Sequence, residues 1–309
     1  MPRKSKAKHK CGFVSILGRP NAGKSTLLNA LLGEKIAIVA SKPQTTRTVI
    51  QGVLTQPNAQ VIFLDTPGIH KSTNLFNRRM MQQVRDSIAD RDLLLYLVDA
   101  TSNPNNNEEE MQALDLVKAC ETPAFLVINK IDKLNAKEAL LERIQQYQAI
   151  HPGFRAFIPV SALKSDGLDE LRRAIIRELP EGPPVFDPDY ITDQPQRFMA
   201  GELVREKILR ATHQEVPHSV AILIEKWDDS SDKVTKISAT IYVERSGQKA
   251  IVIGKGGELL KRIGTNARRD IETLLGKKVF LELFVKVKPD WREDPQFLNE
   301  IDWRAMAGE

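Results

Sequence analysis

The sequence has only two cysteines and no long apolar run among its 309 residues. Cys11 and Cys120 lie far apart without a histidine or second cysteine at ligand spacing, which argues against both a zinc site and a disulfide framework. No stretch approaches the roughly 18 apolar residues that a membrane-spanning helix needs. The start also lacks the hydrophobic region of a signal peptide. We therefore expect a soluble, cytoplasmic protein.

Length and charge indicate a two-domain protein with some affinity for polyanions. The chain exceeds the size of a typical single domain, and its 41% apolar content is ample for packed cores. The net charge of +5 mildly favours an RNA partner. We interpret residues 1–10 as a basic tail; a solvated, disordered end is the favoured interpretation, and contact of its cations with nucleic acid or anionic lipid is the alternative. Its cations are Arg3, Lys4, Lys6, Lys8 and Lys10.

The segment Gly18–Ser25 has the G-x-x-x-x-G-K-[ST] spacing of a phosphate-binding loop. An apolar run over 13–17 precedes it and a helical pattern over 25–32 follows it, as such a loop requires. We expect its N–H groups to surround a phosphate at a helix N-terminus, with Lys24 on the β- and γ-phosphates and the Ser25 hydroxyl on Mg²⁺. The residues assigned to the nucleotide here are Asn21, Ala22, Gly23, Lys24, Ser25 and Thr26.

Four nearly continuous apolar runs predict an α/β domain with a mostly parallel sheet and helices on both faces. None of them alternates with a period of two, as expected for strands that are buried on both faces. In such a sheet, ligands bind beyond the carboxyl ends of the strands. The runs cover 61–64, 93–98, 124–128 and 157–160.

Two polar segments complete the predicted phosphate and metal site. Asp65 ends a strand, and we expect its carboxylate to bind Mg²⁺ through a water molecule. The N–H of Gly68 can approach the γ-phosphate. The loop over 43–47 contains Thr45 and Thr46, and one of these hydroxyls can complete the Mg²⁺ shell. Alone, each segment would be interpreted as an ordinary turn or surface loop.

The segment Asn129–Asp132, Asn-Lys-Ile-Asp, predicts recognition of guanine. Asp132 can accept hydrogen bonds from N1–H and the exocyclic amine, a donor pair that adenine lacks, so GTP is favoured over ATP. Asn129 can hold the loop and contact the N7 side, and the stem of Lys130 can cover the base. A second strand end, formed by Ser161, Ala162 and Leu163, can offer a main-chain N–H to guanine O6.

The order of these motifs resembles the translation-factor-related GTPases, and Gln44-Thr45-Thr46-Arg47 narrows the resemblance to the Era-like group. This resemblance implies that Thr46 is the magnesium threonine and that the GTPase domain covers residues 11–180. The implied catalytic residues are Lys24, Thr46, Asp65 and Gly68.

Ile69 departs from the Ras-like pattern, in which a glutamine at this position orients the attacking water. We therefore expect slow intrinsic hydrolysis. Resemblance to this GTPase class implies a potassium ion, held by Asn21 and by carbonyl groups of the threonine-containing loop.

The chain is dense in proline and glycine over 179–189, and we expect a semi-rigid linker over 181–197. Beyond it the pattern predicts a helix over 198–211, strands over 220–224, 237–243 and 279–287, and a helical run that ends at Leu275. The expected order is α-β-β-α-α-β.

The loop Gly254–Gly257 has the G-x-x-G pattern and opens a helix, and in this order it resembles a type II KH domain. We place that domain at 198–291 and a C-terminal tail at 292–309. Trp291 either stacks on a base or packs within the domain; Trp303 has no readable role, and His70 is interpreted as an exposed loop histidine. The residues assigned to RNA are Gly254, Lys255, Gly256, Gly257, Lys261 and Arg262.

A single GTPase domain joined to a type II KH domain resembles the ribosome-assembly members of the Era-like group. The resemblance implies a monomeric switch that binds the 3′ end of small-subunit ribosomal RNA and assists maturation of the small ribosomal subunit. Two alternatives stay open: an RNA-binding scaffold with a catalytically idle GTPase domain, and a membrane-associated signalling GTPase. Because the motif set occurs once, a tandem GTPase is excluded.

Overall fold

The computed structural model describes residues 9–70, 73–103, 108–213 and 216–304, which divide into two compact units. Within these described ranges, the first unit comprises residues 9–37, 46–70 and 80–193, and the second comprises 38–45, 73–79 and 194–304. Most of the predicted basic tail, residues 1–8, lies outside the described residues, whereas Lys10 begins the first strand. Among the described residues, no helix is long and apolar enough to cross a membrane.

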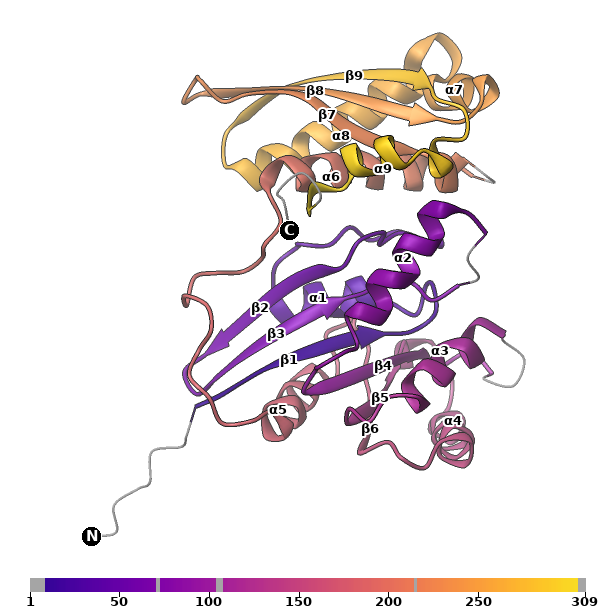
Figure 1. Cartoon of the computed structure of the whole chain (residues 1–309), viewed down its shortest axis with the longest axis vertical. Helices are drawn as coiled ribbons and strands as arrows, with labels where there is room; N and C mark the ends of the chain where they lie inside the picture. Colours follow the sequence, from indigo (N-terminus) through magenta and orange to yellow (C-terminus); the bar gives the residue numbers. More distant parts are fainter. Residues whose placement is uncertain (1–8, 71–72, 104–107, 214–215, 305–309) are drawn as a thin grey trace. The chain divides into compact units, whose positions relative to one another are not determined.

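The first unit is built on a six-stranded sheet in the order β2-β3-β1-β4-β5-β6 (Figure 1). β2 is antiparallel to β3, and the other neighbouring strands are parallel. This mostly parallel sheet confirms the predicted fold class. The strands are β1 Lys10–Leu17, β2 Ile50–Gln56, β3 Ala59–Asp65, β4 Leu93–Asp99, β5 Ala124–Asn129 and β6 Ala156–Pro159.

The central strands are covered on both faces, as their continuous apolar runs predict. Every residue of β3, β4 and β5 is buried. Because successive side chains point to opposite faces, this requires two packed layers. Leu94, Tyr96 and Val98 share one core cluster with side chains of α2, α3 and α4, whereas α1 contacts α5. The helices are α1 Lys24–Leu32, α2 Leu75–Asp86, α3 Glu108–Lys118, α4 Lys137–Ile150 and α5 Leu168–Glu178.

β2 is absent from the sequence-based prediction. Its residues, Ile-Gln-Gly-Val-Leu-Thr-Gln, include a glycine and three polar residues. The last three residues of the strand are only half-buried. Gly52 is needed because the side chains of Leu32 and Ile36 fill the space where a Cβ would lie, at 2.6 and 2.8 Å. The strand is therefore defined by its pairing with β3 and by close helix packing, and hydropathy alone does not reveal it.

The proline-rich segment after α5 is fixed along the first unit up to Asp193. The Gln60 side chain accepts N–H groups from Val185 and Phe186, at 2.7 and 2.9 Å, and donates to the Phe186 carbonyl at 2.9 Å. Farther along, the Ile191 carbonyl accepts the N–H of Val53 at 2.8 Å. Much of the predicted linker over 181–197 is thus an ordered strap, and the next helix begins at Gln196.

The second unit pairs a three-stranded sheet with helices in the predicted order α-β-β-α-α-β. β7 and β8 are antiparallel, and β8 and β9 are parallel. The core-facing residues of β9 alternate with exposed ones, as predicted, so Phe280 and Phe284 remain 55% and 50% exposed. The elements are α6 Gln196–Ala211, β7 Ala221–Asp228, β8 Val234–Val243, α7 Ser246–Ile253, α8 Glu258–Leu275, β9 Lys278–Val287 and α9 Pro295–Ile301.

Two neighbouring charged residues of α6 are buried within the second unit. Glu206 accepts the N–H of Val39 at 3.0 Å, and Arg205 donates to the carbonyl of Thr45. Arg205 also pairs with Glu202 at 2.6 Å. Each buried charge therefore has partners that offset its loss of hydration, and the segment 38–45 owes its place in this unit to them.

Trp291 packs within the second unit, so the alternative of base stacking is wrong. Its side chain is completely buried, and its ring N–H donates to the carbonyl of Ser219 at 3.0 Å. The ring lies edge-on to Phe297 of α9, which closes over it. A buried indole with a satisfied N–H has no free face for a base. Trp303, near the end of the described chain, is also buried and lies beside Phe198.

Candidate nucleotide-binding site

The phosphate loop, residues 18–25, connects β1 to α1 in the predicted way. Gly23 has φ of 102° at the N-terminus of α1, and a Cβ there would overlap the side-chain amide of Asn129. At Gly68 a Cβ would lie 2.9 Å from the Cα of Pro20. Glycine at these positions therefore allows the phosphate loop to contact two other predicted site segments directly.

Lys24 lies inside the phosphate loop. Its Nζ donates to the carbonyls of Gly18 and Arg19, at 3.0 and 3.1 Å. Burial lowers the pKa of Lys24 to about 8, while the nearby Asp65 carboxylate acts in the opposite direction. An ammonium held by neutral carbonyls in a desolvated loop is well suited to a phosphate, which would supply the missing negative charge.

Ser25, Thr46 and Asp65 converge in a buried cluster of oxygen atoms. Ser25 Oγ lies 2.7 Å from Asp65 Oδ2 and 2.6 Å from Thr46 Oγ1, and Thr46 Oγ1 lies 3.3 Å from the same carboxylate oxygen. Thr45 is not part of the cluster, because its hydroxyl donates to the Lys42 carbonyl at 2.6 Å. The structure thus distinguishes between the two threonines that the residue pattern left open.

Asp65 has a buried carboxylate that is only half satisfied. Its Oδ1 has no hydrogen-bond partner among the described residues. Burial raises the pKa of Asp65 to about 6, although Lys24, Ser25 and Thr46 act in the opposite direction. An unsatisfied carboxylate oxygen beside two hydroxyls is the all-oxygen donor set that Mg²⁺ prefers, so these residues fit the predicted ion.

The two residues after Gly68 have protein contacts of their own. Ile69 is 2% exposed and packs in the core cluster with Leu17 and Met81. His70 hydrogen-bonds through Nδ1 to the Gly68 carbonyl at 2.7 Å and is half-buried, so its interpretation as an exposed loop histidine is wrong. The Ile69 side chain therefore belongs to the fold, and no side chain at this position can orient a water.

Asn129 holds three loops together. Its Nδ2 donates to the carbonyl of Ala22 at 2.9 Å, and its Oδ1 accepts the N–H of Ala162 at 3.0 Å. Of the main-chain N–H groups in the segment predicted to face guanine O6, that of Ala162 is therefore bound to Asn129. Asp132 remains exposed and accepts a hydrogen bond from Ser161 Oγ at 2.6 Å, while Leu163 is exposed.

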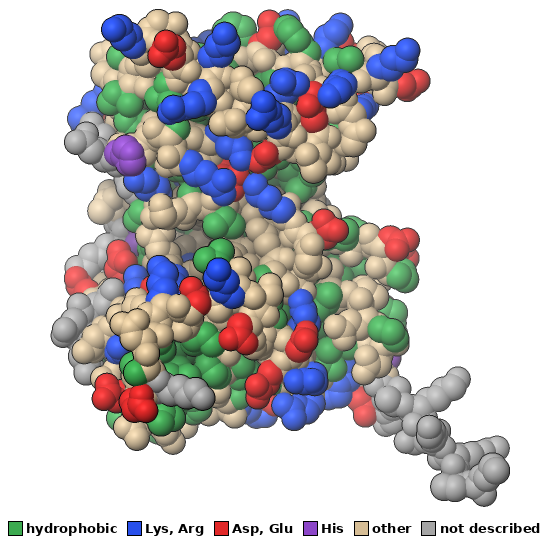
Figure 2. Space-filling view, turned by 180° about the vertical axis from the view of Figure 1, so that it is seen from behind, with side chains coloured by type: hydrophobic (Ala, Val, Ile, Leu, Met, Phe, Trp, Pro, Cys, Tyr) green, Lys and Arg blue, Asp and Glu red, His purple; other side chains and the backbone are tan. Residues whose placement is uncertain are grey.

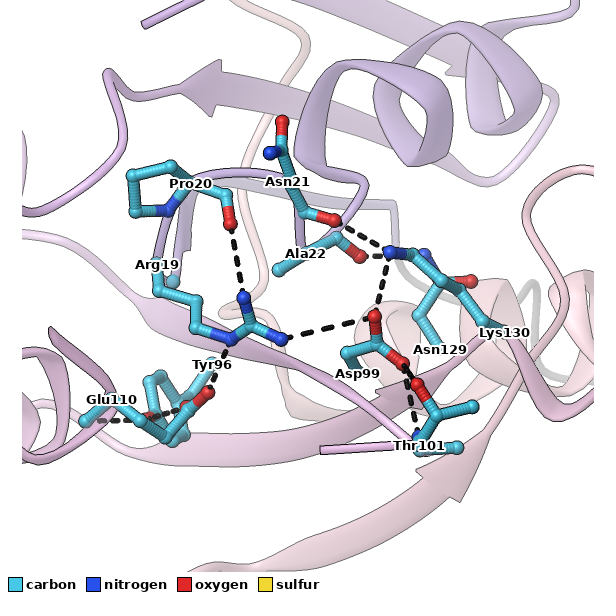
Figure 3. Close-up of polar contacts among 12 residues, drawn as sticks. Arg19, Pro20, Asn21, Ala22, Tyr96, Asp99, Thr101, Glu110, Asn129 and Lys130 are labelled. Carbon is cyan, nitrogen blue, oxygen red and sulfur yellow. Dashed lines mark hydrogen bonds and ion pairs between the residues drawn. The ribbon is translucent and has the colours of Figure 1, made fainter. Parts of the chain in front are cut away.

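Sequence reasoning missed a buried polar cluster beneath the phosphate loop (Figure 3). Arg19, to which the sequence analysis assigned no role, contacts Glu110 of α3 and Asp99 at the end of β4. Asp99 also pairs with Lys130 at 2.7 Å. The one sequence signal is that Asp99, like Asp65, is the last residue of a buried strand; no local pattern distinguishes Arg19 or Glu110.

In the second unit, the G-x-x-G loop between α7 and α8 is built as predicted. Gly254, Gly256 and Gly257 all have positive φ, and a Cβ on Gly254 would lie 2.6 Å from the Cβ of Leu259. The predicted RNA contacts Lys255, Lys261 and Arg262 are exposed. Figure 2 shows many Lys and Arg side chains on this unit. Arg262 also lines a hollow of about 550 Å³ between α6 and α8, with Lys207, Arg210 and Arg269.

Comparison with known proteins finds family models that match two parts of this chain. Residues 13–130 match the family model described as 50S ribosome-binding GTPase, and residues 215–292 match that of the KH domain. The chain is 52% identical to the GTPase Era of Geotalea uraniireducens over 94% of this chain and 97% of the relative. It is 48% identical to that of Leuconostoc citreum over 95% and 96% of the two chains.

Two solved structures are similar over nearly the whole chain. One is Era in complex with MgGDPNP and nucleotides 1506–1542 of 16S ribosomal RNA, with a TM-score of 0.91, 41% identity and coverage of 96% and 99% of the two chains. The other is a point variant of Aquifex aeolicus Era bound to GDP·AlF4⁻, with the same TM-score and identity and coverage of 95% and 99%.

Proposed function

The chain belongs to the Era family of GTPases, and we propose that its hydrolysis of GTP controls the binding of its KH domain to the 3′ end of small-subunit ribosomal RNA. The nucleotide half of this proposal rests on the convergence of Ser25, Thr46 and Asp65 beside Lys24. The RNA half is supported by the similar Era complex that contains nucleotides 1506–1542. Through that RNA, the protein would assist maturation of the small ribosomal subunit.

The phosphate side of the site would work by positioning and charge. Ser25, Thr46 and Asp65, the last through a water, would hold Mg²⁺, which when bound neutralises charge on the β- and γ-phosphate oxygens. Lys24 would exchange its carbonyl partners for phosphate oxygens, and the Gly68 N–H would approach the γ-phosphate. Because Ile69 is buried, water is not oriented by a glutamine-like side chain, and intrinsic turnover is slow.

A potassium ion would supply part of the missing charge stabilisation. Asn21 lies in the phosphate loop with an exposed side chain and a φ of 62°. Its amide oxygen can therefore join carbonyl oxygens around a weakly hydrated cation next to the phosphates. Faster GTP turnover in potassium than in sodium, at matched ionic strength, supports this role; equal turnover contradicts it.

Guanine recognition would centre on Asp132. Its exposed carboxylate can accept two hydrogen bonds from the base, and Ser161 Oγ fixes its orientation. Asn129 serves mainly to brace the surrounding loops, since both of its polar atoms have protein partners. Adenine would leave the carboxylate without its donors, which gives the site its discrimination.

RNA binding would use the G-x-x-G loop and exposed groups near it. The positive φ angles at Gly254 and Gly256 free the main chain to approach single-stranded phosphates, and Lys255 adds a cation. Crosslinking with sequencing, in GTP and GDP states, tests the assignment. Enrichment of the small-subunit RNA 3′ end supports it, and absence of that enrichment in both states overturns it.

We also propose a monomeric, cytoplasmic protein with a fraction bound peripherally to membranes. The basis for the membrane fraction is the cationic start, most of which lies outside the described residues. Sedimentation with phosphatidylglycerol vesicles, and its loss on deletion of residues 1–8, would support this role. No binding by the full chain at low salt would contradict it.

Single-turnover hydrolysis of GTP distinguishes the proposed enzyme from an RNA-binding scaffold with a catalytically idle GTPase domain. Single-turnover hydrolysis by the native chain, lost in Ser25→Ala and Asp65→Ala, supports an enzyme. Bound GTP that stays intact in all three proteins supports the scaffold alternative.

A further inference from the structure

Glu110, on α3, is a completely buried carboxylate that the proposed GTPase mechanism does not use. Its Oε2 accepts Arg19 Nε at 3.0 Å, and its other carboxylate oxygen accepts the hydroxyl of Tyr96. Burial raises the pKa of Glu110, whereas the Tyr96 hydroxyl and the Arg19 guanidinium act in the opposite direction. A buried charge held by two side chains on different elements fixes both of them in one geometry.

The other edge of the Arg19 guanidinium faces Asp99, with Nη2 3.8 Å from Oδ2. The same oxygen accepts Lys130 Nζ at 2.7 Å, and that ammonium also donates to the Asn21 carbonyl at 2.6 Å. Asp99 is itself held by the N–H and hydroxyl of Thr101, at 2.9 and 2.7 Å.

These contacts form a closed path (Figure 3). It leaves the phosphate loop at Arg19, crosses Asp99 and Lys130, and returns to the same loop at Asn21. Glu110 anchors the path to the core at Arg19. We call Arg19, Glu110, Asp99 and Lys130 the loop clamp.

We propose that Arg19, Glu110 and Asp99 are positioning residues that hold the phosphate loop and the base-recognition loop in register for one guanine nucleotide. The proposal rests on the nucleotide site proposed above. A nucleotide spans both loops, so it binds most tightly when their spacing is set in advance and no ordering cost falls on the binding step. The guanidinium is suited to this task because its planar fork reaches two carboxylates at once.

The loop clamp should act on binding and leave the chemical step nearly unchanged. The Arg19 side chain is directed to Glu110, to Asp99 and to the Pro20 carbonyl, whereas Lys24 contacts Arg19 through its main-chain carbonyl, which a side-chain substitution keeps. Loss of the Arg19 or Glu110 charge therefore weakens ground-state and transition-state binding alike, which raises KM for GTP and Kd for GDP while kcat changes little.

The test compares Arg19→Gln, Glu110→Gln and the double variant with the native chain. The matched control is Arg173→Gln, because Arg173 is exposed on α5, away from the phosphate loop in sequence. GDP titration and steady-state GTP kinetics are measured with thermal unfolding. We expect a roughly tenfold rise in GDP Kd and GTP KM for each single variant, about 1.4 kcal/mol, with kcat retained and the control unchanged.

The double variant and a conservative variant supply readouts that a purely structural role would not give. Removing both charges leaves no buried ion without its partner, so the double variant should bind GDP no more weakly than Arg19→Gln alone. Arg19→Lys keeps the positive charge, but a single ammonium group cannot contact the carboxylates of Glu110 and Asp99 at the same time. Its GDP Kd should lie between those of the native chain and Arg19→Gln.

Unchanged GDP Kd and GTP KM in folded Arg19→Gln and Glu110→Gln, with only a lower melting temperature, would overturn the proposal. A fall in kcat at constant KM would also overturn it. If both variants fail to fold, Tyr96→Phe, which removes one hydroxyl, and Asp99→Asn are measured against the same two criteria. A native chain that bound no guanine nucleotide would instead contradict the proposed function.

Discussion

Lys130 of the base-recognition loop donates a hydrogen bond to the main-chain carbonyl of Asn21 in the phosphate loop, at 2.6 Å. The two residues are 109 positions apart in the chain. Asn129, the neighbour of Lys130, repeats the connection by donating to the carbonyl of Ala22. The segments proposed for the base and for the phosphates are therefore joined directly by protein hydrogen bonds.

Replacing Asp132 by alanine should weaken GTP binding far more than it weakens the fold. If the exposed carboxylate binds the guanine edge as proposed, its loss removes about 3 kcal/mol of charged hydrogen bonding, which corresponds to about a 100-fold rise in KM. Steady-state kinetics and competition between GDP and ADP would measure it. The exposed carboxylate Asp169, replaced in the same way, is the control; equal effects of both variants would contradict the assignment of Asp132.

Asp65→Asn should separate stability from activity. The native carboxylate is buried, and one of its oxygens lacks a partner among the described residues, so a neutral isostere removes a desolvation cost. We expect a melting temperature at least as high as that of the native chain, together with a loss of GTP turnover of about 100-fold or more. Thermal unfolding without nucleotide, and phosphate release with Mg²⁺, are the two measurements. Native turnover in this variant would remove Asp65 from the site.

The fold was largely predictable because its central strands are buried on both faces and therefore appear in the sequence as uninterrupted apolar runs. The phosphate loop was predictable for a related reason, since its glycines and Lys24 act within eight consecutive residues. β2 was not predictable, because it is polar along much of its length and depends on pairing with β3.

Part of the site was hidden from sequence reasoning for a physical reason. Arg19 and Glu110 meet across 91 positions, and neither lies in a local pattern that distinguishes it from a solvated charge. Trp291 was ambiguous because its burial depends on α9, which closes over it from beyond the predicted domain. The residue pattern alone left Thr45 and Thr46 open; the family resemblance implied Thr46, and it is Thr46 that lies beside Ser25.

Ile69→Gln should lower stability without accelerating hydrolysis. The side chain is buried in the core, so an amide placed there costs about 2 kcal/mol for lack of partners. Urea unfolding and GTP kcat would be compared with those of Ile69→Leu, which keeps the apolar contacts. A marked rise in kcat for the glutamine variant would show that this side chain can reach the nucleotide after all.

Asp99→Asn should change how stability depends on pH. Burial acts to raise the pKa of Asp99, but hydrogen bonds from Lys130 and Thr101 outweigh it and hold the pKa below its ordinary value of 3.8. A lowered folded-state pKa means that the unfolded chain binds the proton first, so the stabilising contribution is present above about pH 4 and is lost in more acidic solution. The difference in unfolding free energy between native and variant chains should therefore shrink as pH falls below 4. A difference that stays constant down to pH 2 would contradict this.

Trp291→Ala should act on the fold and leave RNA recognition intact in the folded protein. Removing a completely buried indole costs about 3–5 kcal/mol. Lys255→Glu should do the opposite, because Lys255 is exposed beside the glycines of the G-x-x-G loop. Urea unfolding and RNA titration of both variants would test the contrast. Loss of RNA affinity by stably folded Trp291→Ala would restore a recognition role for Trp291.

The most direct test of the account is the affinity of the native chain for an RNA equivalent to nucleotides 1506–1542 of 16S ribosomal RNA, measured with GDPNP and with GDP. A switch requires the two nucleotide states to differ in RNA affinity, and the coupling must be reciprocal. We predict tighter RNA binding with GDPNP, and tighter GDPNP binding, by the same factor, when the RNA is present. Equal RNA affinity in the two states would contradict GTP control of RNA binding.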